Sequence, residues 1–410
     1  MNTPKIRFKG FTDDWEQRKL IDYLDVSNEK NKKGDYKKTD VLSVSGEVGI
    51  VNQIEFQGRS FAGVSVENYG IVNEGDVVYT KSPLKANPYG IIKTNKGKAG
   101  IVSTLYAVYK PKENTDSNFV QIYFELDSRM NSYMHPLVNK GAKNDMKVSD
   151  ENALKGNVTF PKINEQKAIS NFITELDHLI TLHQRKCDET KQLKKFMLQK
   201  MFPKNGEKNP EIRFEGFTDD WEQRKLRENL SFLKDGTHGT HKDVEDGPLL
   251  LSAKNIKNGT VQWDESDRRI SEDEFKSIHA NFKLKEGDVL LTIVGSIGET
   301  AILNNSEGIT FQRSVAFLRP ASKIISEFLY SEIQGYKFQK ELNERKSTSA
   351  QPGIYLSDLG EIPISYPINM DEQVAIGHYF TNIDHLIALH QRKCEKLKEL
   401  KKYMLRNMFI

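Results

Sequence analysis

Cysteine, net charge and long hydrophobic runs are all scarce in this chain of 410 residues. The only two cysteines, Cys187 and Cys394, are expected to be reduced thiols on helices, as is usual in the cytosol. No apolar run is long enough to span a membrane. The N-terminal MNTPKIRFKG lacks the apolar segment of a secretory signal, so a cytoplasmic location is the default expectation.

The charge balance excludes an obvious electrostatic signature of nucleic-acid binding. The formal net charge is +3; residues 21–160 hold 18 basic and 17 acidic side chains, and residues 227–367 hold 17 and 21. Proteins that bind nucleic acid usually carry a basic excess. A DNA-binding role for this chain must therefore rest on its organisation.

That organisation is a duplication. DHLITLHQRKC at residues 177–187 returns as DHLIALHQRKC at 384–394, with ten of eleven positions identical. The opening segment of the first half, IRFKGFTDDWEQRKL at residues 6–20, returns as that of the second, IRFEGFTDDWEQRKL at 212–226, with 14 of 15 identical. A period near 206 residues is far too long for a solenoid repeat, so the chain is a duplicated domain pair. Shorter repeated pieces are EQKAI and EQVAI (165–169, 372–376), and LKKFMLQKMF and LKKYMLRNMF (193–202, 400–409).

The end of each half is expected to be one long helix. Neither tail contains proline, and only Gly377 interrupts the second. Roughly 37 residues at about 1.5 Å each make a rod of about 55 Å. A helix with one apolar stripe needs a partner, and the other copy, packed antiparallel, is the expected one. The stripe of the second copy is Ile376, Phe380, Ile383, Ile387, His390, Cys394, Leu397, Leu400, Met404 and Met408.

The middle of each half is expected to be a mixed α+β domain. Short runs such as GDVVYT (75–80) and GDVLLTIVGSIG (287–298) are rich in β-branched residues and are typical of strands, as are GIVSTLYAVY (100–109) and GITFQRSVAFLRP (308–320). Helical patches are expected at 117–132 and 322–343. The two middles share only landmarks such as EGDV, at 74–77 and 286–289. The repeated frame therefore carries two different middles.

These features together predict an α+β protein: two mixed α/β domains separated by a pair of long antiparallel helices in a pseudo-twofold repeat. The stretch PKNGEKNP at 203–210 is the expected linker. The expected segments are a first domain (1–161), a central long helix (162–202), the linker (203–210), a second domain (211–367) and a C-terminal long helix (368–410).

The order of these motifs resembles the specificity subunit of type I restriction–modification systems over essentially the whole chain. PKINEQKAI (161–169) and PINMDEQVAI (367–376) lead into the helices, and STSAQPGIYLSDLGEIPISYP (347–367) is similar to the closing segment of a target-recognition domain. Each motif alone is modest, but the duplicated order is specific. The resemblance implies a non-catalytic subunit whose two domains each read one half of a split, asymmetric DNA target.

The same resemblance implies partners and cofactors. The paired helices would set the gap between the half-sites and dock two modification subunits, which carry S-adenosylmethionine and methylate adenine N6. Restriction subunits would translocate and cleave DNA using ATP and Mg²⁺, and this chain would bind no cofactor or metal. The candidate helix-pairing and docking residues are Ile169, Leu176, Ile180, His183, Ile376, Ile383, Ile387 and His390.

Base-reading residues are expected in Gly-containing polar loops, because Arg, Lys, Asn, Gln, Ser and Thr read base edges and glycine lets a backbone approach phosphates. Ordinary solvated turns are the alternative for each. In the first middle the candidates are Ser43, Lys81, Ser82, Lys85, Asn87, Tyr89, Lys140, Lys143 and Asn144. In the second they are Ser252, Lys254, Asn255, Thr292, Ser296, Gln312, Arg313, Thr348, Ser349 and Gln351.

Two partial motifs have plainer interpretations. Asn87-Pro88-Tyr89 is similar to the Asn-Pro-Pro-Tyr signature of amino-methyltransferases but lacks its second proline, so a DNA-facing turn is the interpretation. His238 and His241 in THGTH have metal-like spacing, but a zinc site needs three or four ligands and neither cysteine is near, so a polar surface loop is favoured.

Several roles stay open on sequence alone. Trp15 and Trp221 are expected to anchor each domain against the base of a helix, or to belong to a partner-docking face. The alternative for the whole chain is a two-lobed adaptor that binds proteins and never reads DNA. The basic edge of the helices either touches phosphates or is a solvated face; it comprises Lys191, Lys194, Lys195, Lys200, Lys398, Lys401, Lys402 and Arg406.

Overall fold

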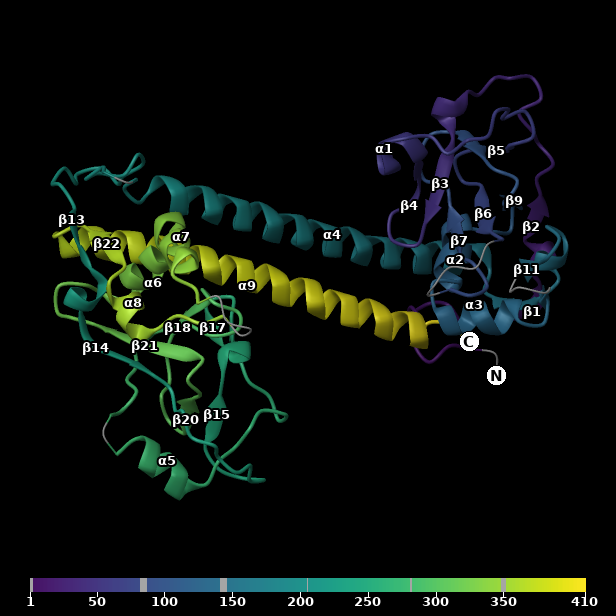
Figure 1. Ribbon diagram of the computed structural model, residues 1–410. Coiled ribbons are helices and arrows are strands. Elements are labelled where there is room, and N and C mark those ends of the chain that lie inside the picture. Colours follow the sequence, from purple (N-terminus) through teal and green to yellow (C-terminus); the bar gives the residue numbers. More distant parts are fainter. Residues whose placement is uncertain (1–2, 82–86, 141–145, 205, 281, 348–351) are drawn as a thin grey trace. The chain divides into compact units, whose positions relative to one another are not determined.

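The computed structural model describes residues 3–81, 87–140, 146–204, 206–280, 282–347 and 352–410. They form two compact units: unit 1 comprises residues 1–182 and 394–410, and unit 2 comprises residues 183–393. Each unit holds a mixed α+β domain and part of each long helix, α4 (Ile163–Lys200) and α9 (Met370–Asn407) (Figure 1). The expected fold class is confirmed. The units divide the chain inside the helices, so the expected domain boundaries stay predictions.

Unit 1 is built on a four-stranded antiparallel sheet of order β2-β9-β6-β7, which comprises β2 (Leu24–Val26), β9 (Tyr106–Pro111), β6 (Val77–Thr80) and β7 (Ile92–Thr94). Its helices are α1 (Gln53–Gln57), α2 (Ser117–Tyr123) and α3 (Asp127–Met134). Paired strands are β1 (Glu16–Lys19) with β12 (Asn157–Phe160), β3 (Leu42–Ser45) with β4 (Gly49–Asn52), β5 (Gly70–Val72) with β8 (Gly100–Val102), and β10 (Asn139–Lys140) with β11 (Met146–Lys147).

Unit 2 repeats this design with a sheet of order β14-β21-β18-β19, which comprises β14 (Leu230–Asp235), β21 (Val315–Pro320), β18 (Val289–Thr292) and β19 (Thr300–Ile302). Its short helices are α5 (Glu272–Ile278), α6 (Ser326–Gln334), α7 (Tyr336–Glu344) and α8 (Leu356–Gly360). Paired strands are β13 (Glu222–Lys225) with β22 (Pro363–Tyr366), β15 (Leu249–Leu251) with β20 (Ile309–Phe311), and β16 (Ile256–Lys257) with β17 (Thr260–Val261).

The repeated EGDV landmark is the turn that starts the inner strand β6 or β18. Gly75 and Gly287 both have φ near +86°, a backbone conformation that glycine adopts without steric cost. The following aspartates close the turn: Asp76 accepts a hydrogen bond from the Asn73 N–H and Asp288 from the Lys285 N–H, at 2.8 and 2.9 Å. All residues of β6 and β18 are buried, which accounts for their continuous apolar and β-branched composition.

The predicted boundaries were wrong in four places, because single segments divide in two. The helical patch at 117–132 is α2 and α3, and the patch at 322–343 is α6 and α7, which meet at Gly335. The apolar run at 100–109 contains β8 and the start of β9, and the run at 308–320 contains β20 and β21. In each case an apolar pattern continues through a change of chain direction, because both flanking elements contribute to the same core.

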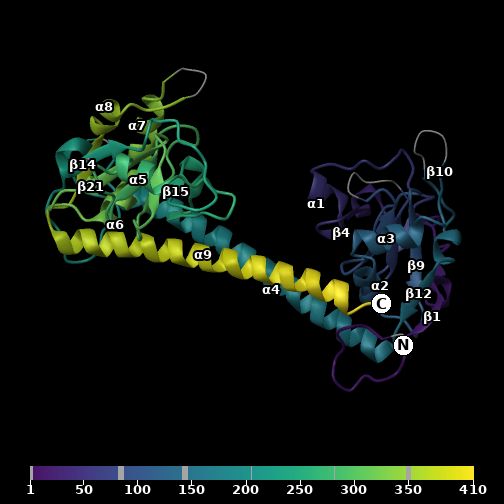
Figure 2. The ribbon, with the colours of Figure 1, turned by 90° about the horizontal axis from the view of Figure 1, so that it is seen from below.

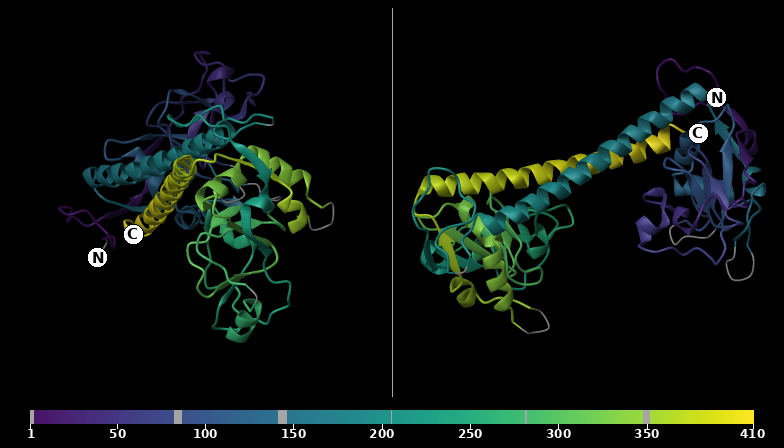
Figure 3. Two further views of the ribbon diagram at one scale, coloured as in Figure 1. Left: turned by 90° about the vertical axis from the view of Figure 1, so that its left-hand side faces the viewer. Right: turned by 90° about the horizontal axis from the view of Figure 1, so that it is seen from above.

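In each unit the two long-helix portions lie side by side (Figure 3) and share a core with the sheet domain. In unit 1 the beginning of α4 packs with the end of α9, for example through Ile173 and Leu405. In unit 2 the end of α4 packs with the beginning of α9, for example through Leu198 and Phe380. The helices are therefore antiparallel, as the stripe predicts.

The one glycine in α9 allows a close approach. A Cβ atom on Gly377 would lie 2.7 Å from the Cβ of Glu327, at the start of α6. This contact explains why a long helix contains a glycine, which usually destabilises a helix interior. None of the described helices combines the length and the apolar character needed to cross a membrane.

Candidate nucleic-acid interface and helix pair

Several predicted loops of unit 2 come together at one place, which we call the unit 2 loop cluster: residues 237–241, 252–253, 292–298, 312–314 and 353. Gln312 N–H donates to the Leu251 carbonyl at 2.8 Å, and Arg313 N–H donates to the Thr237 carbonyl at 3.0 Å. Ile293 N–H donates to the Ser314 carbonyl at 2.9 Å. A β-bridge between Val294 and Gly353 adds the last loop. Main-chain bonds thus gather segments that are far apart in sequence.

The side chains that leave this cluster outward are those of Ser296 and Arg313, with Ser252 and Gln312 partly exposed. The Arg313 guanidinium forms no hydrogen bond or ion pair within the described part of the chain. It follows β20 in a turn whose backbone is fixed on both sides, so its five donors are presented from a rigid base. An arginine placed in this way can bind guanine or phosphate oxygens bidentately.

Two other predicted base readers, Thr292 and Asn255, are used inside the fold. The Thr292 hydroxyl donates to the Ser296 carbonyl and accepts from the Glu299 N–H, and the side chain is fully buried. Asn255 is buried and donates to Asp267 and to the Gln262 carbonyl, both at 3.0 Å. Since these polar atoms are already bonded, both residues shape loops rather than present groups to a base.

Lys254, a further candidate, is exposed but ion-paired to Asp267 at 2.7 Å. Burial alone would raise the pKa of Asp267, but hydrogen bonds from Asn255 and Lys254 outweigh it and lower the pKa to about 2. The carboxylate is therefore charged throughout the physiological range. Its bonds fix the segment between β15 and β17.

The segment 237–241 was the part of this cluster that sequence reasoning undervalued. Its histidines bond locally: His238 contacts Asp235 at 2.6 Å, and His241 contacts the Thr237 hydroxyl at 2.8 Å and Glu274 at 3.2 Å. No group of three or more metal-ligand side chains forms among the described residues. A polar turn directly after a strand was the only sequence signal for this location.

The candidates of unit 1 are mostly engaged. Lys81 forms an ion pair with Asp150 at 2.9 Å, and Asn87 donates to Asp127. Ser43 is buried and accepts from the Gln53 amide at 3.3 Å, and the Tyr89 ring is buried. Apolar side chains are instead exposed at neighbouring turns, Val48 at the β3–β4 tip and Leu105 before β9. The two units therefore present different chemistry.

Some candidates cannot be assigned a position. Lys140 belongs to β10, but its side chain is outside the described part of the chain. Those that lie wholly outside the described residues are Ser82, Lys85, Lys143, Asn144, Thr348, Ser349 and Gln351. They stay predictions.

The predicted pairing stripe is largely buried. Ile169 and Leu176 of α4 lie in the core of unit 1, and Ile376, Ile383 and Ile387 of α9 lie in that of unit 2; Ile180 is half-buried. Leu400 is an exception, because it is exposed while Leu405 takes the core position. Both cysteines are buried thiols that form no disulfide bond.

His183 and His390 form the predicted pair. Their Nδ1 atoms lie 3.0 Å apart, so one donates and the other accepts. The rings lie 5.2 Å apart between centroids and are half-buried. Burial lowers the pKa of His183, and the nearby His390, Lys393 and Lys186 lower it further. The neutral form of His183 is therefore favoured at neutral pH.

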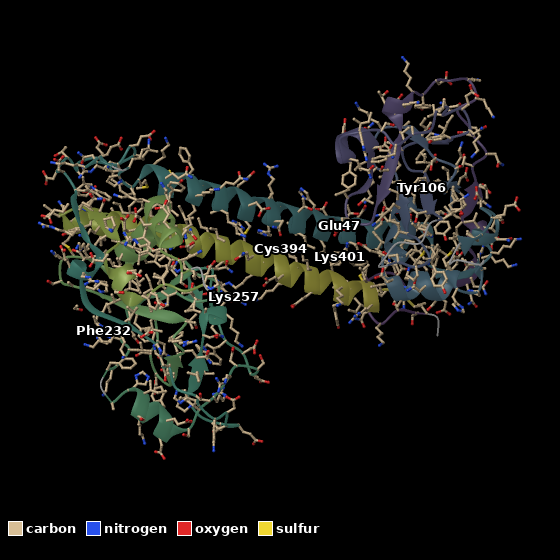
Figure 4. All side chains as sticks on the ribbon, viewed as in Figure 1. Glu47, Tyr106, Phe232, Lys257, Cys394 and Lys401 are labelled. Atoms are coloured by element: carbon tan, nitrogen blue, oxygen red, sulfur yellow. The ribbon has the colours of Figure 1, made fainter. Side chains whose placement is uncertain are left out.

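Two lysines of the predicted basic edge point inward, so neither of the two interpretations, phosphate contact or a solvated face, holds for them. Lys401, labelled on α9 in Figure 4, lies 2.7 Å from Asp177 of α4 and 2.6 Å from Glu125 in the turn after α2. Lys194 of α4 repeats the arrangement with Asp384 of α9 at 2.6 Å and Gln334 of α6. Each lysine therefore joins three segments of its unit.

The pKa shifts of these lysines differ in direction. Burial would lower the pKa of Lys401, but Glu125 and Asp177 outweigh it and raise the pKa. Burial lowers the pKa of Lys194 despite the attraction of Asp384.

Lys200 pairs at 2.5 Å with Glu211, directly before the opening segment of the second half. For the other residues of the basic edge, contact with DNA phosphates and a solvated face both stay possible interpretations.

The repeated EQ motif holds the opening segment of each half to its helix. Glu165 binds Arg7 of the first half through two hydrogen bonds of 2.7 Å, and Glu372 binds Arg213 of the second at 2.7 and 2.9 Å. The Gln166 amide donates to the Pro161 carbonyl at 2.8 Å and accepts from Asp116 N–H. Gln373 makes the equivalent bonds to Pro367 and Ile325.

The tryptophans of the two opening segments anchor each domain against the end of a long helix, which was the first of the two interpretations of these residues. Trp15 is buried and packs edge-on against Phe409, just beyond α9, at 6.3 Å. Trp221 packs against Phe202, just beyond α4, at 6.0 Å. Each opening segment is further tied by a backbone bond of 2.9 Å to the helix end, from Ile6 to Asn407 and from Ile212 to Lys200.

Apolar side chains stay exposed at equivalent places of both helices. Phe196 of α4 is 49% exposed, and its equivalent Tyr403 of α9 is 56% exposed. The same holds for Leu193 with Leu400 and for Leu179 with Leu386. The opening segments, the EQ motifs and the inward lysines do not cover these positions in either copy, so each helix offers a similar exposed apolar face.

Comparisons with known proteins identify relatives of this arrangement. Residues 12–192 and 219–399 each match the family model described as type I restriction modification DNA specificity domain. The chain is 25% identical over 342 residues to the Type I restriction enzyme MjaVIII specificity subunit of Methanocaldococcus jannaschii, over 81% of this chain and 77% of the relative.

A shorter match is to the Type I restriction enzyme EcoBI specificity subunit of Escherichia coli, 27% identical over 38% of this chain and 33% of the relative. A crystal structure of the S subunit of a type I restriction-modification system from M. genitalium is similar in fold, with a TM-score of 0.62, 14% identity, and coverage of 100% of this chain and 99% of that chain. This similarity supports the fold class.

Proposed function

Because the chain belongs to the type I restriction–modification DNA specificity family, we propose that it reads the two halves of a bipartite, asymmetric DNA target. As a specificity subunit it is a non-catalytic component of the restriction–modification enzyme. Each sheet domain would read one half-site. The two helices would dock two modification subunits that methylate adenine N6.

One observation carries this proposal: a repeated frame holds two unlike loop sets. The arginines of the opening segments, the EQ motifs, the buried lysines and the tryptophan anchors recur in both halves with nearly the same distances. The loops do not recur: unit 2 presents Gln312 and Arg313, whereas unit 1 exposes Val48 and Leu105. Different side chains read different bases, so the two half-sites should differ and the target should not be a palindrome.

The chemistry of each loop set supports base reading. Arginine is the commonest partner of guanine O6 and N7, and glutamine pairs with adenine N6 and N7. In unit 1 apolar side chains suit the thymine methyl group. Of the candidates, Ser252, Ser296, Gln312 and Arg313 are the ones that we assign to base or phosphate contact in unit 2.

The repeated exposed apolar positions support the docking of two identical partners. Aromatic residues are enriched at protein–protein interfaces, and Phe196 and Tyr403 stand at equivalent, exposed places. A pseudo-twofold pair of faces on one chain can bind two copies of one subunit. We propose that S-adenosylmethionine, ATP and Mg²⁺ are bound by partner subunits, including the restriction subunits, and not by this chain.

A domain exchange tests whether the two domains read independently. Residues 227–367 would be replaced by the corresponding segment of a specificity subunit with a different target, and the methylated sequence determined. We expect a change in one half-site only. A change in both halves would contradict independent reading by the two domains.

The alternative of a protein-binding adaptor predicts a different result. Phosphate contacts release counterions, so DNA binding should weaken steeply with added salt. Absence of any salt-dependent mobility shift with duplex DNA, in a complex that still contains the modification subunits, would favour the adaptor.

A further inference from the structure

Unit 2 contains a cavity between the end of α4 and the junction of α6 with α7. It measures about 520 Å³. Its lining includes Leu198 and Phe202 of the α4 end, Glu332 and Gly335 of the α6 end, and Tyr336. Because the frame is repeated, the equivalent place in unit 1 shows what fills such a space.

In unit 1 an arginine occupies the equivalent place. α2 and α3 lie beside the end of α9 (Figure 2), and Arg129 of α3 reaches across to it. Its guanidinium lies 4.8 Å from the centroids of both the Tyr123 and Phe409 rings. It donates to the Tyr123 carbonyl at 2.7 Å and to the Leu405 carbonyl at 3.2 Å. These bonds satisfy carbonyls of two helix ends.

The correspondence between the two sites follows from shared contacts. Phe409 and Phe202 each pack on the tryptophan of an opening segment, as do Phe119 and Phe328. Glu125 and Gln334 each bind the buried lysine. Counting along the helices from these pairs, Leu198 corresponds to Leu405, Glu332 to Tyr123, and Phe338 to Arg129.

In unit 2 the arginine is missing and a carboxyl group has been added. Phe338 is turned into the core and is 1% exposed, so it leaves the space between Phe202 and Glu332 empty. Glu332 is buried, and one carboxyl oxygen accepts from the Ser365 N–H at 2.9 Å. It forms no ion pair among the described residues. A buried carboxyl without a cationic partner is costly, unless it stays neutral or acquires one.

The charges at the rim are already occupied. Lys204 pairs with Glu211 at 3.0 Å, and Glu341 pairs with Arg345 at 3.0 Å. Lys340 contacts Glu344 at 3.7 Å, and Lys337 contacts the Ser365 hydroxyl at 3.4 Å. None of these cations reaches Glu332 to form an ion pair.

We propose that this cavity receives the guanidinium of an arginine side chain from a docked protein partner, in the place that Arg129 fills in unit 1. The occupant is taken to be a protein because the cavity borders the exposed face of α4. Gln199 lines it and stands three residues after the exposed Phe196, which makes them neighbours on the helix surface. The proposal thus rests on the proposed docking of a partner along α4.

The chemistry gives the interaction a pH dependence. Burial raises the pKa of Glu332 to about 8, so the empty cavity holds a neutral carboxyl group at pH 7. A guanidinium favours the ionised carboxylate, so its binding releases a proton. Binding should therefore strengthen as the pH rises from 7 towards 9.

The cavity itself can be tested with the full chain and small probes. N-acetylarginine amide would be titrated against N-acetylcitrulline amide, which has nearly the same shape but no charge. The readout is the indole N–H signal of Trp221, since that ring packs against Phe202. Trp15 is the internal control, because the Arg129 guanidinium already covers the Phe409 ring that packs against Trp15. We expect a saturable shift of Trp221 with the arginine probe and binding roughly tenfold weaker with citrulline.

The variant Glu332→Gln imitates the neutral carboxyl group, so the fold should be kept. It should lose the preference for arginine and the pH dependence. Glu341→Gln, at the rim, is the matched control and should keep both. Equal binding of the two probes, or an unchanged preference in Glu332→Gln, would overturn the proposal.

The source of the guanidinium is tested separately in the complex with the modification subunit. Glu332→Gln should weaken that complex roughly tenfold, whereas Glu341→Gln should not. If the arginine probe binds the cavity but Glu332→Gln leaves the complex unchanged, the assignment to a docked partner is wrong. Whether or not Glu332→Gln weakens the complex, the methylated sequence should stay the same, because the loop sets determine which sequence is methylated. If the proposed function itself were wrong, methylation would be absent.

Discussion

Single buried side chains hold the repeated frame together, and the two inward lysines are the clearest examples. Lys401 is 13% exposed and neutralises Asp177 of α4 and Glu125 in the turn after α2. Removing one member of a buried ion pair leaves the remaining charges without compensation. The same argument applies to Lys194, where Asp384 also accepts from the Tyr330 hydroxyl at 2.7 Å.

Lys401→Met tests this role. We expect the free energy of unfolding to fall by about 2–4 kcal/mol, because Asp177 and Glu125 lose their partner. The control is Lys398→Met on the same helix; Lys398 is exposed, and the change should cost less than about 0.5 kcal/mol. Urea unfolding followed by tryptophan fluorescence measures both. Equal effects of the two variants would contradict the account.

The proposed base reading by unit 2 depends most directly on Arg313. Arg313→Ala should weaken binding to the target duplex by about 1–3 kcal/mol, because a bidentate contact to a base edge is lost. Arg224→Ala is the control; its exposed guanidinium contacts Glu222 at 3.4 Å, outside the unit 2 loop cluster. Affinities would be measured on duplexes altered in one half-site at a time. A uniform loss with all duplexes would show that Arg313 contacts phosphate and reads no base.

At the scale of the helices, the contact between α4 and α9 should make the stability of the fold depend on pH. The pKa of His183 lies below its ordinary value of 6.5 in the folded chain, so the folded state binds fewer protons than the unfolded state. The stability from the His183–His390 pair is therefore fully present above about pH 6.5 and is lost as the pH falls through the folded pKa.

We expect the urea midpoint to fall between pH 7.5 and 5.5, and the fall to be smaller in His183→Asn/His390→Asn. His178→Asn is the matched control on the same helix, because His178 is exposed. An unchanged pH dependence in the double variant would mean that other groups cause the acid sensitivity.

The exposed face of each helix carries a prediction about stoichiometry. Phe196→Asp or Tyr403→Asp should each remove one modification subunit, because a charge on one apolar face leaves the other face intact. The double variant should bind none. Mass measurement of the purified complexes distinguishes these cases. A single variant that loses both subunits would show that the faces are not independent.

Local periodicity in the sequence predicted the helices well, but not everything that they contact. The stripe of Ile376, Ile383 and Ile387 follows from spacing alone. The prediction that Leu400 belongs to the buried stripe was wrong. A straight helix drifts away from a strict heptad repeat, which brings Leu405 inward instead. Lys194 and Lys401 were unpredictable, since their carboxylate partners on the other helix are 190 and 224 residues away in sequence.

At the scale of the whole chain, the duplication predicted the two mixed domains and the unlike middles. The loop clusters were only partly predictable. Thr292 and Asn255 are of residue types that commonly read bases, but their hydrogen bonds close turns within the fold. Thr237 was undervalued because its place beside Gln312 depends on an isolated β-bridge between two segments that are distant in sequence. Polar loop residues look alike in a sequence whether they face solvent or support a turn.

The central claim is that one chain reads two different half-sites. Methylome sequencing of a restriction-deficient host that expresses this chain with its modification subunit tests it most directly. The account predicts a single split, asymmetric motif with a modified adenine in both halves. A palindromic motif, or no new methylation despite a stable complex, would contradict it.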